Sequence, residues 1–128
     1  MKIRLEAGLP FISVVVAYRD QQLTLDQVVL DTGSAGTLFS ADRLSEIAIK
    51  LTNRDPIYQV RGVGGKEFVY GKVVDSLIIG GVRTGAVEIE VGSMEYGRPI
   101  DGILGLDLLM KLGAQIDLSL MVFALPSG

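Results

Sequence analysis

Several residue types are missing from this chain, and each absence excludes a kind of chemistry. Its 128 residues include no cysteine and no histidine. Without cysteine there is no thiolate nucleophile and no Cys-bound zinc, and the composition fits the cytoplasm or another reducing compartment. Without histidine, Ser-His-Asp and Cys-His mechanisms and His-bound metals are excluded as well. We therefore expect a protein that works without a metal and without a cofactor.

Long apolar runs and clusters of positive charge are also missing. No stretch approaches 18 consecutive apolar residues, so we expect no membrane contact from this segment. Twelve Lys and Arg residues against fifteen Asp and Glu residues give a net charge of −3, and the basic residues form no run, which argues against nucleic-acid binding. The alternating, charged residues 1–6 are unlike a signal peptide. We expect one soluble domain over residues 1–128, which is equally compatible with a domain excised from a longer chain.

Short strands separated by glycine turns dominate the rest of the pattern. The chain has sixteen glycines, few aromatic residues and 48% hydrophobic residues. Apolar runs predict strands over residues 3–6, 11–18, 23–30, 57–61, 66–70, 73–79, 82–91, 114–118 and 120–125, with helices over residues 41–51 and 107–112. The expected fold is a mostly β, barrel-like domain with eight or nine strands and two helices.

The most distinctive stretch is Asp31-Thr32-Gly33-Ser34, which directly follows the apolar residues 28–30. A carboxylate at the end of a buried strand needs hydrogen-bond donors, because burying a bare charge is costly. The Thr32 and Ser34 hydroxyls and the backbone N–H groups of a glycine-containing turn are suitable donors. We expect the Ser34 hydroxyl to bond the carboxylate. From these residues alone, the stretch is either a functional site or a well-capped tight turn.

The order of this motif with three later elements resembles that of the retropepsin-like aspartic proteases, the single-domain relatives of pepsin. A helix follows the motif, then a hairpin tipped by Gly62-Val63-Gly64-Gly65, then a second apolar run into glycine at Ile103-Leu104-Gly105. The resemblance covers the chain from about residue 9 to residue 125. It implies a retropepsin-like acid-protease barrel with a flap hairpin and one or two short helices.

The resemblance also implies a role for each matching residue. The catalytic set would be Asp31, Thr32, Gly33 and Ser34, in which Asp31 is the catalytic aspartate and the Thr32 hydroxyl locks two active-site loops together. The hairpin tip would close over a peptide or protein substrate, and Ile103-Leu104-Gly105 would support the active-site loop. The substrate-binding set would be Gly62, Val63, Gly64, Gly65 and Ile100.

A single Asp-Thr-Gly motif has a consequence for assembly. The aspartic protease mechanism uses two carboxylates that share a proton, one acting as base toward a water and the other as acid toward the carbonyl. Asp101-Gly102 is not a second copy of the motif, because the hydroxyl residue is missing. The second carboxylate must then come from a second chain, so we expect a C₂ homodimer that uses residues 114–125 as its interface. The expected function is aspartic endopeptidase, with a water activated between two Asp31 carboxylates.

Three other interpretations compete with this one. A strand-end aspartate also attacks phosphate in some phosphoryl-transfer enzymes, but those enzymes need a parallel α/β sheet. Actin-like ATP binders need a far longer chain. The strongest alternative is a non-catalytic dimerisation or peptide-binding module of the same fold, which would hold an extended segment beneath the flap by strand addition.

Overall fold

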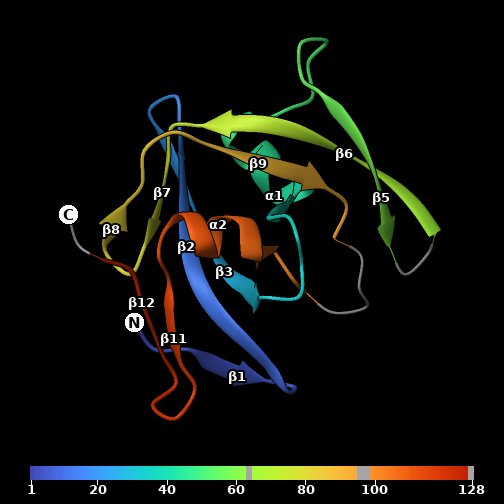
Figure 1. The fold of residues 1–128 in the computed structure, drawn as a ribbon. Helices are drawn as coiled ribbons and strands as arrows, with labels where there is room; N and C mark the ends of the chain where they lie inside the picture. The colour runs from blue at the N-terminus through green and yellow to red at the C-terminus, as the bar shows by residue number, and fades with distance from the viewer. Residues whose placement is uncertain (63–64, 95–98, 127–128) are drawn as a thin grey trace.

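The computed structural model describes residues 1–62, 65–94 and 99–126, and within these ranges it is mostly β (Figure 1). One large mixed sheet, one two-stranded sheet and short helices make up the fold. The strands are β1 (Arg4–Glu6), β2 (Leu9–Tyr18), β3 (Gln21–Asp31), β4 (Leu38–Ser40), β5 (Ile57–Gly62), β6 (Gly65–Val74), β7 (Ser76–Ile79), β8 (Val82–Arg83), β9 (Val87–Gly92), β10 (Gly102–Gly105), β11 (Gln115–Asp117) and β12 (Val122–Ala124). The helices are α1 (Ala41–Leu44), the 3-10 helix η1 (Ser45–Ile47) and α2 (Leu106–Lys111).

The large sheet is open. Its strands follow the order β5-β6-β9-β4-β10-β3-β2-β7-β8, and β1 pairs with β2 outside this path. The mostly β prediction is confirmed, but the sheet does not close into a barrel, because β5 and β8 at its two ends do not pair with each other. The strand number also exceeds the expected one. The predicted strands over 73–79 and 82–91 are each divided, since β6 ends at Val74, β7 begins at Ser76, and β8 and β9 are separate.

Strand β3 lies at the centre of the sheet and carries the candidate site at its end. Its first half alternates, with Leu23 and Leu25 buried and Thr24 and Asp26 exposed, as expected for a strand with one solvated face. Residues 28–30 are all buried, because at this point β2 and β10 flank the strand on both sides. Asp31, the next residue, is half-buried and lies where β3 ends, just outside the core.

The helix predicted over residues 41–51 is much shorter than expected. Ser40 is its N-cap, accepting a hydrogen bond from the Arg43 backbone N–H, but α1 has four residues and passes directly into η1. Ala48 then adopts a left-handed conformation, with φ of 63°, which ends the helix. The helical spacing of apolar residues is therefore partly accidental, since Leu51 lies outside the helix and is 52% exposed.

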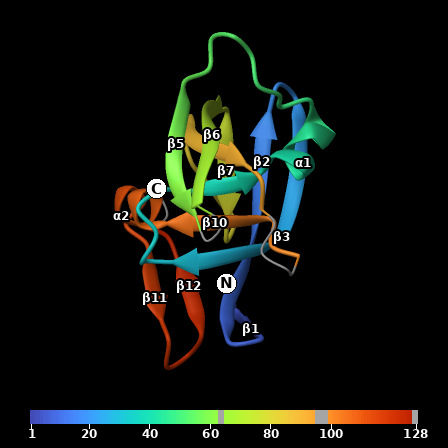
Figure 2. The same ribbon diagram turned by 90° about the vertical axis from the view of Figure 1, so that its right-hand side faces the viewer.

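The glycine-tipped hairpin forms as predicted. Strands β5 and β6 pair antiparallel from Ile57 opposite Tyr70 to Gly62 opposite Gly65. The two strands form one end of the large sheet, where Figure 2 shows them next to each other, and β6 pairs with β9 only from Tyr70 onward. The hairpin is thus an arm that extends beyond β9. The tip residues Val63 and Gly64 lie outside the described residues.

The C-terminal part follows the prediction closely. Helix α2 ends at its C-cap Leu112, and Gly113 has a left-handed φ of 65°, the role of a C′ glycine. Strands β11 and β12 then form the two-stranded sheet. The N-terminal segment joins it, because the Met1 ammonium donates a hydrogen bond to the Phe123 carbonyl at 2.7 Å. Among the described residues, no helix is long and apolar enough to cross a membrane.

Candidate active site

Asp31 is the last residue of β3 and lies opposite Gly105, the last residue of the parallel strand β10. Its side chain is half-buried. The Gly33 backbone N–H donates to Asp31 Oδ1 at 2.9 Å, and the Ser34 N–H donates to the Asp31 carbonyl at 3.1 Å. The other carboxylate oxygen, Oδ2, accepts no hydrogen bond from any described residue. The turn therefore orients the carboxylate through one oxygen and leaves the second available.

The two hydroxyl residues of the motif are not placed alike. The Ser34 hydroxyl donates to the Gly36 carbonyl at 3.0 Å. The prediction that it bonds the Asp31 carboxylate is therefore wrong, because a hydroxyl has one proton and the turn uses it. Thr32 is exposed and makes no hydrogen bond to the described part of the chain. A side chain in this position is available to another molecule.

Thr37 fixes the loop that carries the motif, and the sequence offered no sign of this role. The residue is 1% exposed. Its hydroxyl accepts a hydrogen bond from the Gly105 N–H at 3.0 Å and donates one to Asp107 Oδ1 at 2.9 Å. A third bond runs from the Leu106 N–H to the Ser34 carbonyl at 2.7 Å. These bonds attach the loop after Asp31 to the junction of β10 and α2.

Gly105 allows this close attachment. A Cβ atom built on Gly105 would lie 2.6 Å from the Gly36 carbonyl carbon and 2.9 Å from the Ser34 carbonyl oxygen. Both neighbours are backbone atoms, which move only with the loop itself. The glycine of the predicted Ile103-Leu104-Gly105 support is therefore required by sterics, and it places the loop directly against β10.

Glu90 also lies against this loop, from the side of β9. Its carboxylate is in van der Waals range of Gly36, where a Cβ would lie 3.2 Å from Glu90 Cδ. Burial raises the pKa of Glu90 above its ordinary value, and the charges of Asp107 and Glu88 raise it further. Glu90 is thus half-buried beside the loop, not a side chain of a solvated strand edge.

This environment predicts a pH-dependent effect of Glu90→Gln. A carboxyl group whose pKa is raised by folding destabilises the folded state once it ionises, so the cost begins above its ordinary pKa of 4.5 and is complete above the raised value. Glutamine has no charge and removes the cost. We expect Glu90→Gln to raise the Tm modestly at about pH 7 and to leave it unchanged at about pH 3. An equal rise at both pH values would instead indicate a packing effect.

Asp101 has a structural role. It is 9% exposed and its carboxylate is fully occupied. One oxygen pairs with Arg43 Nη1 at 2.9 Å, and the other accepts the Gln27 N–H at 3.1 Å. These contacts join β3 to α1. They agree with the sequence interpretation that Asp101-Gly102 is not a second active-site motif.

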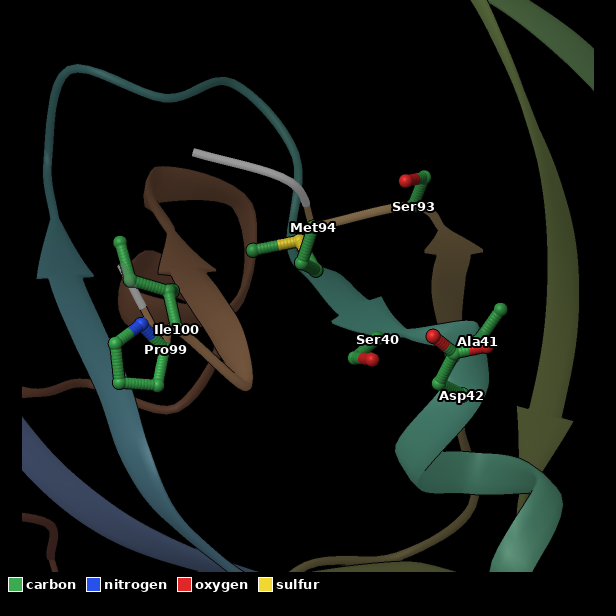
Figure 3. Close-up of a pocket in the computed structure, with 7 residues that line it drawn as sticks. All are labelled: Ser40, Ala41, Asp42, Ser93, Met94, Pro99 and Ile100. Atoms are coloured by element: carbon green, nitrogen blue, oxygen red, sulfur yellow. The ribbon is translucent and has the colours of Figure 1, made fainter. Parts of the chain in front are cut away.

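Three residues of the predicted substrate-binding set, Gly62, Gly65 and Ile100, lie in the described chain, and Gly62 pairs with Gly65 at the end of the hairpin. Ile100 lines a pocket of about 240 Å³ whose other walls come from the start of α1 and the end of β9, and this pocket does not include Asp31. In Figure 3, Met94 lies between the Pro99–Ile100 segment and the start of α1. No hydrogen bond or ion pair between described residues joins β5 or β6 to the loop after Asp31. The structure thus brings together the motif, Thr37 and Gly105. The placement of the hairpin tip and Ile100 as substrate-binding residues stays a prediction.

The described residues contain no group of three or more acidic side chains placed to hold a metal ion. The site consists of an aspartate at the end of a strand, in a turn that contains glycine. A second, parallel strand that ends in glycine packs against this turn. This arrangement is that of a retropepsin-like aspartic protease. A family model described as aspartyl protease matches residues 14–108. The chain belongs to this family of aspartyl proteases. A search among curated proteins finds no match for it.

Proposed function

We propose that this protein is an aspartic endopeptidase that works as a homodimer. Each chain would supply one domain over residues 1–128 and one half of a two-fold active site. The observation that supports this most directly is the carboxylate of Asp31, which is held through Oδ1 by the Gly33 N–H while Oδ2 has no partner among the described residues. A general acid or base needs such an oxygen, free to exchange a proton with water or substrate.

The proposed chemistry uses the Asp31 carboxylates of two chains, one ionised and one protonated. The ionised group takes a proton from a water molecule while the water oxygen bonds to the carbonyl carbon of the peptide. The protonated group gives its proton to the carbonyl oxygen. In the collapse of the tetrahedral intermediate, the carboxyl that took the water's proton gives it to the leaving nitrogen and the C–N bond breaks. A hydroxyl of the intermediate returns its proton to the other carboxylate as the carbonyl of the new acid forms. These steps need no cofactor.

The second carboxylate must come from another molecule, because the chain has one Asp-Thr-Gly motif. Two features favour the side of the molecule that carries α2, β11 and β12 as the interface. Met110, Leu118 and Leu120 are each about 70% exposed there. A mostly apolar hollow of about 260 Å³, lined by Thr32 together with residues of α2 and β11, lies beside the active-site loop. A partner that covered this side would remove these apolar side chains and the hollow from water, which favours association.

A non-catalytic peptide-binding or dimerisation module of the same fold is the alternative. The hairpin arm favours it in one respect, because Phe68 of β6 is 69% exposed and would pack on an extended peptide. A binding groove, however, does not require a carboxylate with a free oxygen. We therefore rank the protease first.

Titration with a statine-containing peptide tests the proposal, since the statine hydroxyl resembles the tetrahedral intermediate. We expect tight binding with one inhibitor for every two chains, and a loss of activity per chain when the enzyme is diluted below its dimer dissociation constant. The measurements are calorimetric stoichiometry and sedimentation alongside a peptide-cleavage assay. A monomer that cleaves with undiminished specific activity, or one inhibitor bound per single chain, would contradict the dimeric site.

A further inference from the structure

A second surface feature lies at the other end of the molecule from Asp31. A groove of about 650 Å³ is bounded by the β2–β3 turn, by the segment that leads from η1 to β5, and by the last residues of β6. Figure 2 shows the β2–β3 turn next to that segment, and residues of both line the groove. Strand β3 runs from this turn to Asp31, and eleven residues of strand span roughly 35 Å. The groove is therefore separate from the active site.

The groove gathers positive charge on a chain that is negative overall. Its lining contains Arg19, Lys50, Arg54 and Lys72, against two acids, Asp55 and Asp75. The net charge of the protein is −3. One third of the twelve basic residues thus face one groove, which makes it a local site of attraction for anions.

The two acids of the groove are already engaged within the chain. Asp55 Oδ2 accepts hydrogen bonds from Lys72 Nζ at 2.7 Å and from the Thr52 N–H at 2.7 Å. The bond to Lys72 is the largest of the contacts that hold the pKa of Asp55 below its ordinary value. Asp75 Oδ2 accepts the Arg19 backbone N–H at 2.8 Å. Asp55 is thus paired with Lys72, whereas Asp75 keeps its negative charge, because a hydrogen bond from a neutral N–H does not remove it.

Four cations against two acids give the lining a net charge of +2, and three of the cations have no ion-pair partner in the described chain. Within the described ranges the side chains of Arg19, Lys50 and Arg54 form no ion pair with a carboxylate. The Arg19 guanidinium is stacked over the Tyr18 ring at 5.0 Å, which orders it without changing its charge. Exposed lysines outside the groove, such as Lys2 and Lys111, also form no ion pair in the described ranges, so the groove differs from them in gathering its cations on one surface. The groove thus combines a net positive charge with a concave surface.

We propose that this groove is an exosite that binds an acidic segment of a polypeptide. The shape favours an extended peptide over a single small anion, because the groove has a volume of about 650 Å³ and its unpaired cations come from two separate segments of the chain. Phosphate sites usually combine cations with several convergent backbone N–H groups, whereas here the Thr52 and Arg19 N–H groups are already bonded inside the chain. The overall negative charge disfavours nucleic acid.

The groove also lies against the base of the flap. Asp55, which Lys72 holds, is followed by Pro56, whose carbonyl accepts the Gly71 N–H at 2.9 Å, and β5 begins at the next residue. An acidic segment bound here would be held at the point where the hairpin arm leaves the sheet. The exosite itself does not depend on catalysis by Asp31.

The test measures binding of a fluorescein-labelled octapeptide of glutamate by anisotropy, with the Asp31→Asn protein so that cleavage cannot interfere. We expect saturable binding that weakens as sodium chloride is raised. An octapeptide of glutamine should not bind. The double variant Lys50→Gln/Arg54→Gln should bind about tenfold more weakly, the effect of losing two exposed ion pairs. Both side chains lack an ion-pair partner in the described chain, so their replacement should leave folding intact.

The matched control is Lys2→Gln/Lys111→Gln, which removes the same charge from exposed positions outside the groove. It should bind the glutamate peptide like the parent protein. Equal weakening by both double variants would overturn the exosite, because net charge alone would then explain binding. Stronger displacement by inorganic phosphate than by sodium chloride of the same ionic strength would overturn the peptide assignment, as would tighter binding of a single-stranded DNA octamer. Failure of the protease activity would not change any of these outcomes.

Discussion

Asp31→Asn is expected to lower kcat/KM for peptide hydrolysis by about 10⁴-fold, the upper range for the loss of an acid–base group. The asparagine amide can neither take a proton from the attacking water nor give a proton to the carbonyl oxygen of the substrate. The fold should remain, because Asp31 is half-buried and the asparagine carbonyl oxygen can still accept the Gly33 N–H. The measurement is steady-state cleavage of one peptide, with Tm recorded for the same samples.

Asp26→Asn is the matched control, since it makes the same chemical change five residues earlier in β3, at an exposed position. It should retain activity. Mixing adds a second readout: an equal amount of the Asp31→Asn chain should lower wild-type activity to about half once subunits have exchanged at random, because mixed dimers hold one carboxylate. Undiminished cleavage by the Asp31→Asn protein would remove the basis for assigning a protease function. Activity that mixing does not change would point to a site complete in one chain.

Local sequence patterns were sufficient to predict the strands at the centre of the fold and the turn that carries Asp31. The apolar run 28–30 followed by glycine correctly predicted a buried strand that ends at Asp31, and Gly62 and Gly65 correctly framed a hairpin. The apolar run into glycine at Ile103-Leu104-Gly105 was predicted to support the active-site loop, and it lies in β10, the parallel neighbour of β3. In each case the signal lies within a few consecutive residues, so it can be recognised before the tertiary contacts are known.

The bracing of the site could not be predicted in this way. Thr37 is an ordinary hydroxyl residue in the sequence, and its two hydrogen-bond partners lie 68 and 70 residues away. The Ser34 hydroxyl was assigned to the carboxylate because both groups are close in sequence, but the turn directs it to the Gly36 carbonyl. The helix over 41–51 failed for a similar reason. Its apolar spacing is helical, yet the chain leaves the helix at the left-handed residue Ala48, and the next residue, Ile49, is buried in the core.

Gly105→Ala is expected to impair both stability and activity. The new methyl group would overlap the backbone of Gly36 and Ser34, which can yield only if the loop after Asp31 moves away from β10. Overpacking of this kind destabilises proteins by about 1–3 kcal/mol, which is less than the usual free energy of unfolding, so most molecules should still fold. A displacement of about 1 Å at the reacting group lowers rates by roughly 10²-fold. We therefore expect a lower Tm together with a fall in kcat/KM of at least about 10²-fold.

Two other glycines separate these effects. Gly102→Ala, in the same strand, would place its methyl group 2.8 Å from Phe39 Cε1 and 3.0 Å from the Leu38 carbonyl oxygen, so it should lower the Tm without displacing the loop after Asp31. Gly85→Ala meets no atom within 4 Å and should change neither quantity. If activity follows Tm alone across the three variants, the close approach of Gly105 serves only stability. If Gly105→Ala loses far more activity than Gly102→Ala at comparable Tm, β10 holds the carboxylate in its working position.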